Sequence, residues 1–289
     1  MNSAIMNDFA VDSRSLSGAL QAKLSAVRAA GFSQITLCAQ DIVNHPGGVD
    51  AGVAAVRASG LHVMAFQAPV NLEGTTGPMQ HYKLDVVKAM LGMCAALRCR
   101  LLVLPSSSLS GGSDAVQRVC DLRRLAVLAI PMSIKIGYQG WQGGSLVKDY
   151  LQAWDLVCAA DMPNLGLCLD SYGLLTSNTP IEALLEDLDM LDPDKLFLVQ
   201  LADRLGADPE PWRVFPGDGD QSDKLASIVS TLHTLGYRGG YSLAAFNTDY
   251  ASLPPQHVAQ LAKACVLWLG QDVLQRSVPL PNQIRLRRA

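Results

Sequence analysis

Short apolar runs alternate with longer segments of helical periodicity eight times along the chain. The expected strands are residues 4–10, 34–38, 62–67, 101–105, 133–137, 165–170, 196–201 and 239–244. The expected helices are 16–30, 48–59, 81–97, 113–128, 145–160, 181–190, 223–235 and 255–269. Runs such as LLVL and LFLVQL are almost wholly apolar, which is typical of parallel strands buried on both faces. Eight such units predict an α/β fold, a single (β/α)8 TIM barrel.

One domain accounts for the whole length, because barrels of this kind reach 289 residues without a second core. We therefore expect one TIM-barrel domain over 1–289, with 271–289 as a C-terminal tail. A doubly wound open sheet is the alternative fold. No glycine-rich phosphate motif follows the first strand, so we expect no nucleotide cofactor.

Composition and charge exclude several classes of partner. With 49% hydrophobic residues and 17% charged residues, the chain can bury a large core. Its net charge of −3 offers no attraction to phosphate backbones, so we expect no nucleic-acid partner. It has neither a leader pattern nor an apolar run of about 18 residues, so we expect a cytoplasmic protein and no membrane partner. The sequence leaves a homo-oligomer open.

Polar side chains close most of the apolar strands. In a parallel barrel these ends meet at one mouth, where active sites form. The residues concerned are Gln67, Ser106, Tyr138, Gln139, Asp170, Gln200 and Asp203. Arg213 follows in the loop WRVFPGDGD, and its guanidinium fork suits a substrate carboxylate. The glycines of this loop predict either an anion-binding turn or an ordinary polar turn.

Several segments resemble bacterial 3-dehydroshikimate dehydratases, within the xylose-isomerase-like superfamily. They are NLGLCLDSYGLL, LFLVQLAD, RVFPGDGD and YSLAAFNTDY, with AAGFSQITLCAQDI and FQAPVNLEG earlier in the chain. The resemblance implies one divalent metal, Mn²⁺ or Mg²⁺, held by carboxylates and a Gln or His at four strand ends. Such a metal polarises a carbonyl or stabilises an enolate while a base removes the α proton.

Carried over by position, the metal ligands are incomplete. Asp170 and Gln200 match two of them, but Gln139 and Ala244 stand where the resemblance implies glutamates. Gly173 stands where it implies a histidine. Neutral amides and a methyl group attract a hard cation less than carboxylates do. We therefore expect the metal to bind weakly at Asp170, Gln200 and Gln139, or to be lost, and Gln139→Glu with Ala244→Glu to tighten it.

Two functions remain open at the level of sequence. The first is a divergent lyase or isomerase that acts on a small polyhydroxylated carbonyl acid or sugar, with Asp170 as acid or base. Its substrate would contact Arg213, Gln67, Ser106 and Tyr138. The second is a non-catalytic barrel that binds a small molecule or regulates an active relative. The small molecule is the only partner that both functions share.

Overall fold

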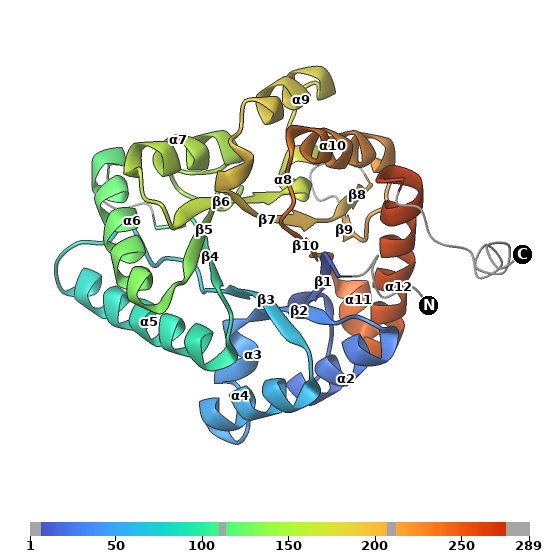
Figure 1. The fold of residues 1–289 in the computed structure, drawn as a ribbon, viewed down its shortest axis with the longest axis horizontal. Coiled ribbons are helices and arrows are strands. Elements are labelled where there is room, and N and C mark those ends of the chain that lie inside the picture. Colours follow the sequence, from blue (N-terminus) through green and yellow to red (C-terminus); the bar gives the residue numbers. More distant parts are fainter. Residues whose placement is uncertain (1–6, 110–113, 207–211, 276–289) are drawn as a thin grey trace, which may run out of the picture.

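A closed barrel of parallel strands forms the centre of the computed structural model, which describes residues 7–109, 114–206 and 212–275 (Figure 1). Its strands follow the order β1-β10-β7-β6-β5-β4-β3-β2 around the barrel. Their bounds are β1 Phe9–Asp12, β2 Gln34–Cys38, β3 His62–Gln67, β4 Leu101–Pro105, β5 Lys135–Gln139, β6 Leu165–Asp170, β7 Leu196–Leu201 and β10 Gly240–Leu243. The predicted (β/α)8 barrel is confirmed.

Helices surround the barrel as an outer ring (Figure 1). The longer ones are α2 Leu20–Ala30, α4 Gly48–Ser59, α5 Gly77–Leu97, α6 Ala115–Ala129, α7 Tyr150–Ala160, α9 Ile181–Asp189, α10 Ser222–Leu235 and α12 Pro255–Trp268. Short helices follow three strand ends: α3 Ala39–Val43, α8 Ser171–Leu175 and α11 Thr248–Ser252. Across the described ranges, no helix combines the length and the apolar character that a membrane crossing requires.

Strand alternation connects the barrel core to the mouth. A small buried cluster consists of Ala65, Leu101, Val103, Cys168 and Leu198, apart from the larger core beneath the helices. Side chains two positions apart share one face of a strand. Gln67, Asp170 and Gln200 therefore continue the inward face of Ala65, Cys168 and Leu198, one layer nearer the mouth.

Two strands lie further along the sequence than predicted. β1 is Phe9–Asp12 instead of 4–10, and β5 is Lys135–Gln139 instead of 133–137. Ser133 has a φ of 54°, which ends the preceding helical turn and is incompatible with an extended strand. Residues 1–6 and the end of the predicted tail, 276–289, lie outside the described residues.

A two-stranded antiparallel hairpin after β7 was not predicted. It pairs β8 Asp203–Leu205 with β9 Trp212–Val214, so that Arg204 lies opposite Arg213. Strands of three residues carry too little periodicity to be recognised in a sequence. This hairpin holds Arg213 over the mouth of the barrel.

Candidate functional site

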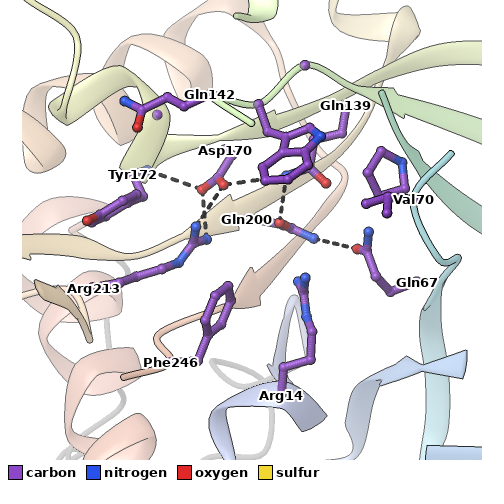
Figure 2. Close-up of a pocket in the computed structure, with 14 residues that line it drawn as sticks. Arg14, Gln67, Val70, Gln139, Gln142, Asp170, Tyr172, Gln200, Arg213 and Phe246 are labelled. Carbon is purple, nitrogen blue, oxygen red and sulfur yellow. Dashed lines mark hydrogen bonds and ion pairs between the residues drawn. The ribbon is translucent and has the colours of Figure 1, made fainter. Parts of the chain in front are cut away.

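A pocket of about 290 Å³ opens at the C-terminal ends of the barrel strands (Figure 2). It is lined by Arg14, Gln67, Val70, Pro105, Gln139, Gly140, Trp141, Gln142, Asp170, Tyr172, Gly173, Gln200, Arg213 and Phe246. The volume is near the lower end of the range for small-molecule sites. Polar groups cover the floor and aromatic rings cover the rim, an arrangement that suits a small hydroxylated ring.

Arg213 forms a bidentate ion pair with Asp170. Nη1 donates to Oδ2 at 2.9 Å and Nη2 donates to Oδ1 at 2.8 Å, with both side chains only 10–11% exposed. Nε donates to the main-chain oxygen of Ala244. The rings of Tyr172 and Phe246 lie 5.0 Å and 4.5 Å from the guanidinium carbon. Each of the three guanidinium nitrogens therefore donates to an oxygen of the protein itself.

Three glutamine amides form a chain across the floor. Gln139 Nε2 donates to Gln200 Oε1 at 3.0 Å and approaches Asp170 Oδ2 at 3.4 Å. Gln200 Nε2 in turn donates to Gln67 Oε1 at 3.0 Å. All three amides are at least 95% buried, so these hydrogen bonds fix their positions. The chain connects β5, β7 and β3 beneath the pocket.

Arg14 enters the pocket from the end of β1. Its Nε donates to Asp12 Oδ1 at 3.0 Å and its Nη2 donates to Asp12 Oδ2 at 2.6 Å. Asp12 is fully buried, whereas the Arg14 side chain is 28% exposed. The guanidinium carbon lies 4.9 Å from the ring centre of Phe246, so this ring contacts both arginines of the pocket. Arg14 is a second fixed cation at the mouth.

The groups present do not fit a divalent metal. Asp170 is the sole carboxylate among the residues that line the pocket, and both its oxygens accept from Arg213. Ala244, where the resemblance implied a glutamate, offers a methyl group and is fully buried. In the part of the chain that the structure describes, no three His, Cys, Asp or Glu side chains form a metal-binding group. Two guanidinium groups beside one carboxylate repel a dication.

Five of the eight predicted site residues meet at this pocket, and Ser106, Tyr138 and Asp203 do not. Gln67, Gln139, Asp170, Gln200 and Arg213 line it. Ser106 is fully buried, and its hydroxyl donates to the main-chain oxygen of Val147 at 2.7 Å. Tyr138 is also fully buried, and its hydroxyl donates to Glu73 Oε1 at 3.0 Å. Since Tyr138 neighbours Gln139 on one strand, the two side chains point to opposite faces.

Tyr138 belongs to a buried network behind the pocket. Glu73 accepts from Arg118 Nη1 at 2.8 Å and from the main-chain nitrogen of Ser107 at 2.8 Å. Burial raises the pKa of Glu73, and burial together with this carboxylate raises the pKa of Tyr138. The network joins the loops after β3 and β4 to α6, so it holds the wall of the pocket in place.

The PGDGD turn surrounds a carboxylate of the chain itself. Fully buried Asp203 accepts from Ser222 Oγ at 2.6 Å, and from the main-chain nitrogens of Gly217 at 3.4 Å and Gln221 at 3.3 Å. Gly219 has no room for a side chain, because a Cβ would lie 2.5 Å from Asp203 Oδ1. Of the two alternatives for this turn, these contacts favour a structural turn over an anion-binding site.

Arg14 and the aromatic rim were missed at the level of sequence. Phe246 and Tyr172 follow strand ends, but the strand-end rule selects polar side chains and therefore does not identify aromatic rings. Arg14 follows Asp12, the last residue of β1. The predicted strand ends at residue 10 and the predicted helix begins at residue 16, so Arg14 falls in the connection between them. The rule for strand ends finds it once β1 is correctly bounded.

Comparisons with known proteins identify the family of the barrel. A sequence profile of xylose isomerase-like TIM barrels matches residues 24–269. A 3-dehydroshikimate dehydratase of Pseudomonas aeruginosa is 31% identical over 277 residues, covering 92% of this chain and 42% of that protein. An inosose isomerase of Bacillus subtilis is 27% identical over 147 residues, covering 49% of this chain and 51% of that protein.

Solved structures show the same barrel. A xylose isomerase-like TIM barrel/4-hydroxyphenylpyruvate dioxygenase fusion protein has a TM-score of 0.83 at 28% identity, covering 93% of this chain and 44% of that chain. The IOLI protein with a bound zinc atom has a TM-score of 0.78 at 20% identity, covering 94% of this chain and all of that chain. The match to this chain covers 42% of the length of the Pseudomonas aeruginosa dehydratase, so the chain spans about two fifths of that relative.

Proposed function

This chain belongs to the xylose isomerase-like TIM barrel family, and we propose that it binds a small polyhydroxylated carbonyl acid without the divalent metal that the resemblance implies. The observation that carries the proposal is the two-armed contact of Arg213 with Asp170. It places a fixed positive charge where a cation would be coordinated. The site thus keeps a local charge balance with no bound ion.

Both the relatives and the pocket support this ligand class. The relatives are a dehydratase of a keto acid and an isomerase of an inosose, by their names. Arg14 and Arg213 line the pocket and each is paired with a carboxylate, Asp12 or Asp170; the Nη1 edge of Arg14, which Asp12 does not contact, suits an acid. The ring of Trp141, which lines the pocket, offers a flat apolar surface to a cyclic ligand. The amide floor offers hydrogen bonds to hydroxyl groups.

Of the two functions that the sequence left open, the geometry favours binding over proton abstraction. A general base needs a lone pair free to reach the substrate proton. Asp170 is the sole acidic side chain lining the pocket, and each of its oxygens accepts two hydrogen bonds: Oδ1 from Arg213 and the main-chain nitrogen of Tyr172, Oδ2 from Arg213 and Gln139. In this proposal Asp170 positions Arg213 and does not act as the acid or base predicted from the sequence.

The test is a calorimetric titration of the chelator-treated chain with 3-dehydroshikimate and, separately, with Mn²⁺. We expect heat from the acid without metal, no saturable Mn²⁺ binding and no absorbance change from dehydration. An uncharged cyclic polyol of similar size is the control ligand and should bind more weakly. Stoichiometric Mn²⁺ binding with turnover would overturn the proposal.

A further inference from the structure

Two hydrogen-bond donors in the pocket have no partner in the described part of the chain. Gln67 Nε2 is buried and unpaired, on a side chain that is 3% exposed. Arg14 Nη1 likewise has no contact among those that hold its Nε and Nη2 on Asp12. In Figure 2 the Arg14 guanidinium points into the pocket, and the Gln67 amide lies at one side of it, next to Gln200 and Val70. For buried Gln67 Nε2 the missing partner costs free energy, which a ligand acceptor would recover, whereas the Arg14 side chain is 28% exposed, so its Nη1 is accessible to a ligand.

The orientation of the Gln67 amide is set by Asp170, which lies at the other end of the row of three glutamine amides. A carboxylate only accepts, so Gln139 must present its nitrogen to Asp170. The oxygen of Gln200 then faces Gln139, and the nitrogen of Gln200 faces the oxygen of Gln67. The nitrogen of Gln67 is left over. Asp170 thus dictates, through three amides, that the last group of the chain is a donor.

The two arginines differ in which side of the guanidinium is occupied. Arg213 presents its Nη1/Nη2 side to Asp170 and its Nε to Ala244, so neither edge is left for a two-point contact with a ligand carboxylate. Arg14 uses its Nε/Nη2 side on Asp12, which leaves the Nη1/Nη2 side. That side has the geometry to bind a carboxylate with two parallel hydrogen bonds. Asp12 and the ring of Phe246 hold the guanidinium in place, and the Arg14 side chain, which lines the pocket, is 28% exposed.

We propose that Arg14 and Gln67 form a carboxylate subsite at the β1/β3 side of the pocket. This inference rests on the proposed function and assigns the acid group of the ligand to a residue other than Arg213. The hydroxylated body of the acid then lies toward Gln139 and Trp141, opposite the carboxylate. The ligand class is an organic acid with one carboxylate and a short, hydroxylated, largely cyclic body.

The experiment measures the affinity of the full chain for 3-dehydroshikimate and for its uncharged methyl ester. We expect the acid to bind at least about tenfold tighter than the ester, because hydrogen bonds to charged groups contribute about that much or more. Arg14→Met should abolish this preference while the ester binds as before, and Arg14→Lys should restore part of it. Arg57→Met, on the exposed face of α4, is the matched control and should change nothing.

Arg14→Met leaves Asp12 buried without its partner, so the double variant Asp12→Asn/Arg14→Met is measured in parallel with thermal unfolding of each protein. A folded double variant that still prefers the acid would overturn the subsite. Loss of the preference in that variant supports it.

A titration with acetate separates the subsite from the proposed function. The probe is the Arg14 Nε–H signal in ¹⁵N NMR spectra, assigned by its absence in Arg14→Met. If 3-dehydroshikimate binds and Arg14→Met keeps the preference for acid over ester, the subsite is wrong and the proposed function stands. If 3-dehydroshikimate does not bind but acetate shifts the Arg14 signal, the subsite stands and the proposed function fails. If neither occurs, both fail.

Discussion

Removing Arg213 should be the step that allows the pocket to accept a metal. Gln139→Glu and Ala244→Glu restore the two glutamates that the resemblance implies, but they leave the guanidinium on Asp170. The Nη atoms lie 2.8–2.9 Å from the Asp170 oxygens, so an ion coordinated by those oxygens would lie about 5 Å or less from the guanidinium. The double variant therefore brings the ion against a fixed positive charge.

The size of this repulsion follows from Coulomb's law. A dication and a unit charge about 5 Å apart, at an effective dielectric constant of about 20, repel by roughly 7 kcal/mol. That corresponds to a factor of about 10⁵ in affinity if the arginine cannot move. Because the side chain can turn away at some cost, we expect the triple variant with Arg213→Met to bind Mn²⁺ at least about a hundredfold tighter than the double variant.

The assay is the loss of the free Mn²⁺ signal in electron paramagnetic resonance, with thermal unfolding to establish that each variant is folded. A triple variant with Arg213→Lys keeps the positive charge without the planar fork, so it serves as the control and should bind Mn²⁺ about as weakly as the double variant. Equal Mn²⁺ affinity in the double and Arg213→Met triple variants would refute the idea that this guanidinium excludes the ion.

Three further outcomes concern the groups that support the pocket. Burial raises the pKa of Glu73 in the folded state, so the folded chain holds that proton more tightly than the unfolded chain. The free energy of unfolding of the wild type, relative to Glu73→Gln, should therefore fall as the pH rises above the ordinary glutamate pKa; urea titrations at several pH values that show a constant difference would contradict this. Arg118→Met should cost about 3–5 kcal/mol of stability by leaving Glu73 buried and unpaired, and adding Glu73→Gln should recover much of it in urea unfolding. Asp203→Ala should cost roughly 3 kcal/mol in the same measurement, against less than about 1 kcal/mol for the exposed Asp220→Ala; equal effects would argue against Asp203 organising the turn.

The barrel could be predicted from the sequence because its central strands are apolar on both faces. The bounds predicted for β4, β6 and β7 agree with those found. β5 was misplaced because local backbone geometry, not hydrophobicity, sets its start, as the φ of Ser133 shows. β1 continues to Asp12, two residues beyond its predicted end. The antiparallel hairpin after β7 is too short to leave a periodic signal.

The members of the site were easier to predict than their pairings. Gln67, Asp170 and Gln200 could be grouped because the C-terminal ends of parallel strands meet at one mouth. Arg213 contacts Asp170 because the β8/β9 hairpin directs its side chain inward. The sequence alone does not indicate which partner such a long side chain contacts. Arg14 was missed because an error of two residues in the end of β1 moved it from the mouth to a connecting segment.

Charge balance explains why these residues occur together. Three carboxylates around a dication, as the resemblance implies, carry a net charge of about −1. With amide and methyl groups at 139 and 244, Asp170 alone would be a nearly buried carboxylate without a counter-charge, which is costly. Arg213 supplies that counter-charge from within the chain, so the mouth needs no ion to be stable. Among the described residues, Gln67 Nε2 then has no partner and Arg14 keeps an edge that Asp12 does not contact, and these are the groups to which we assign the ligand carboxylate.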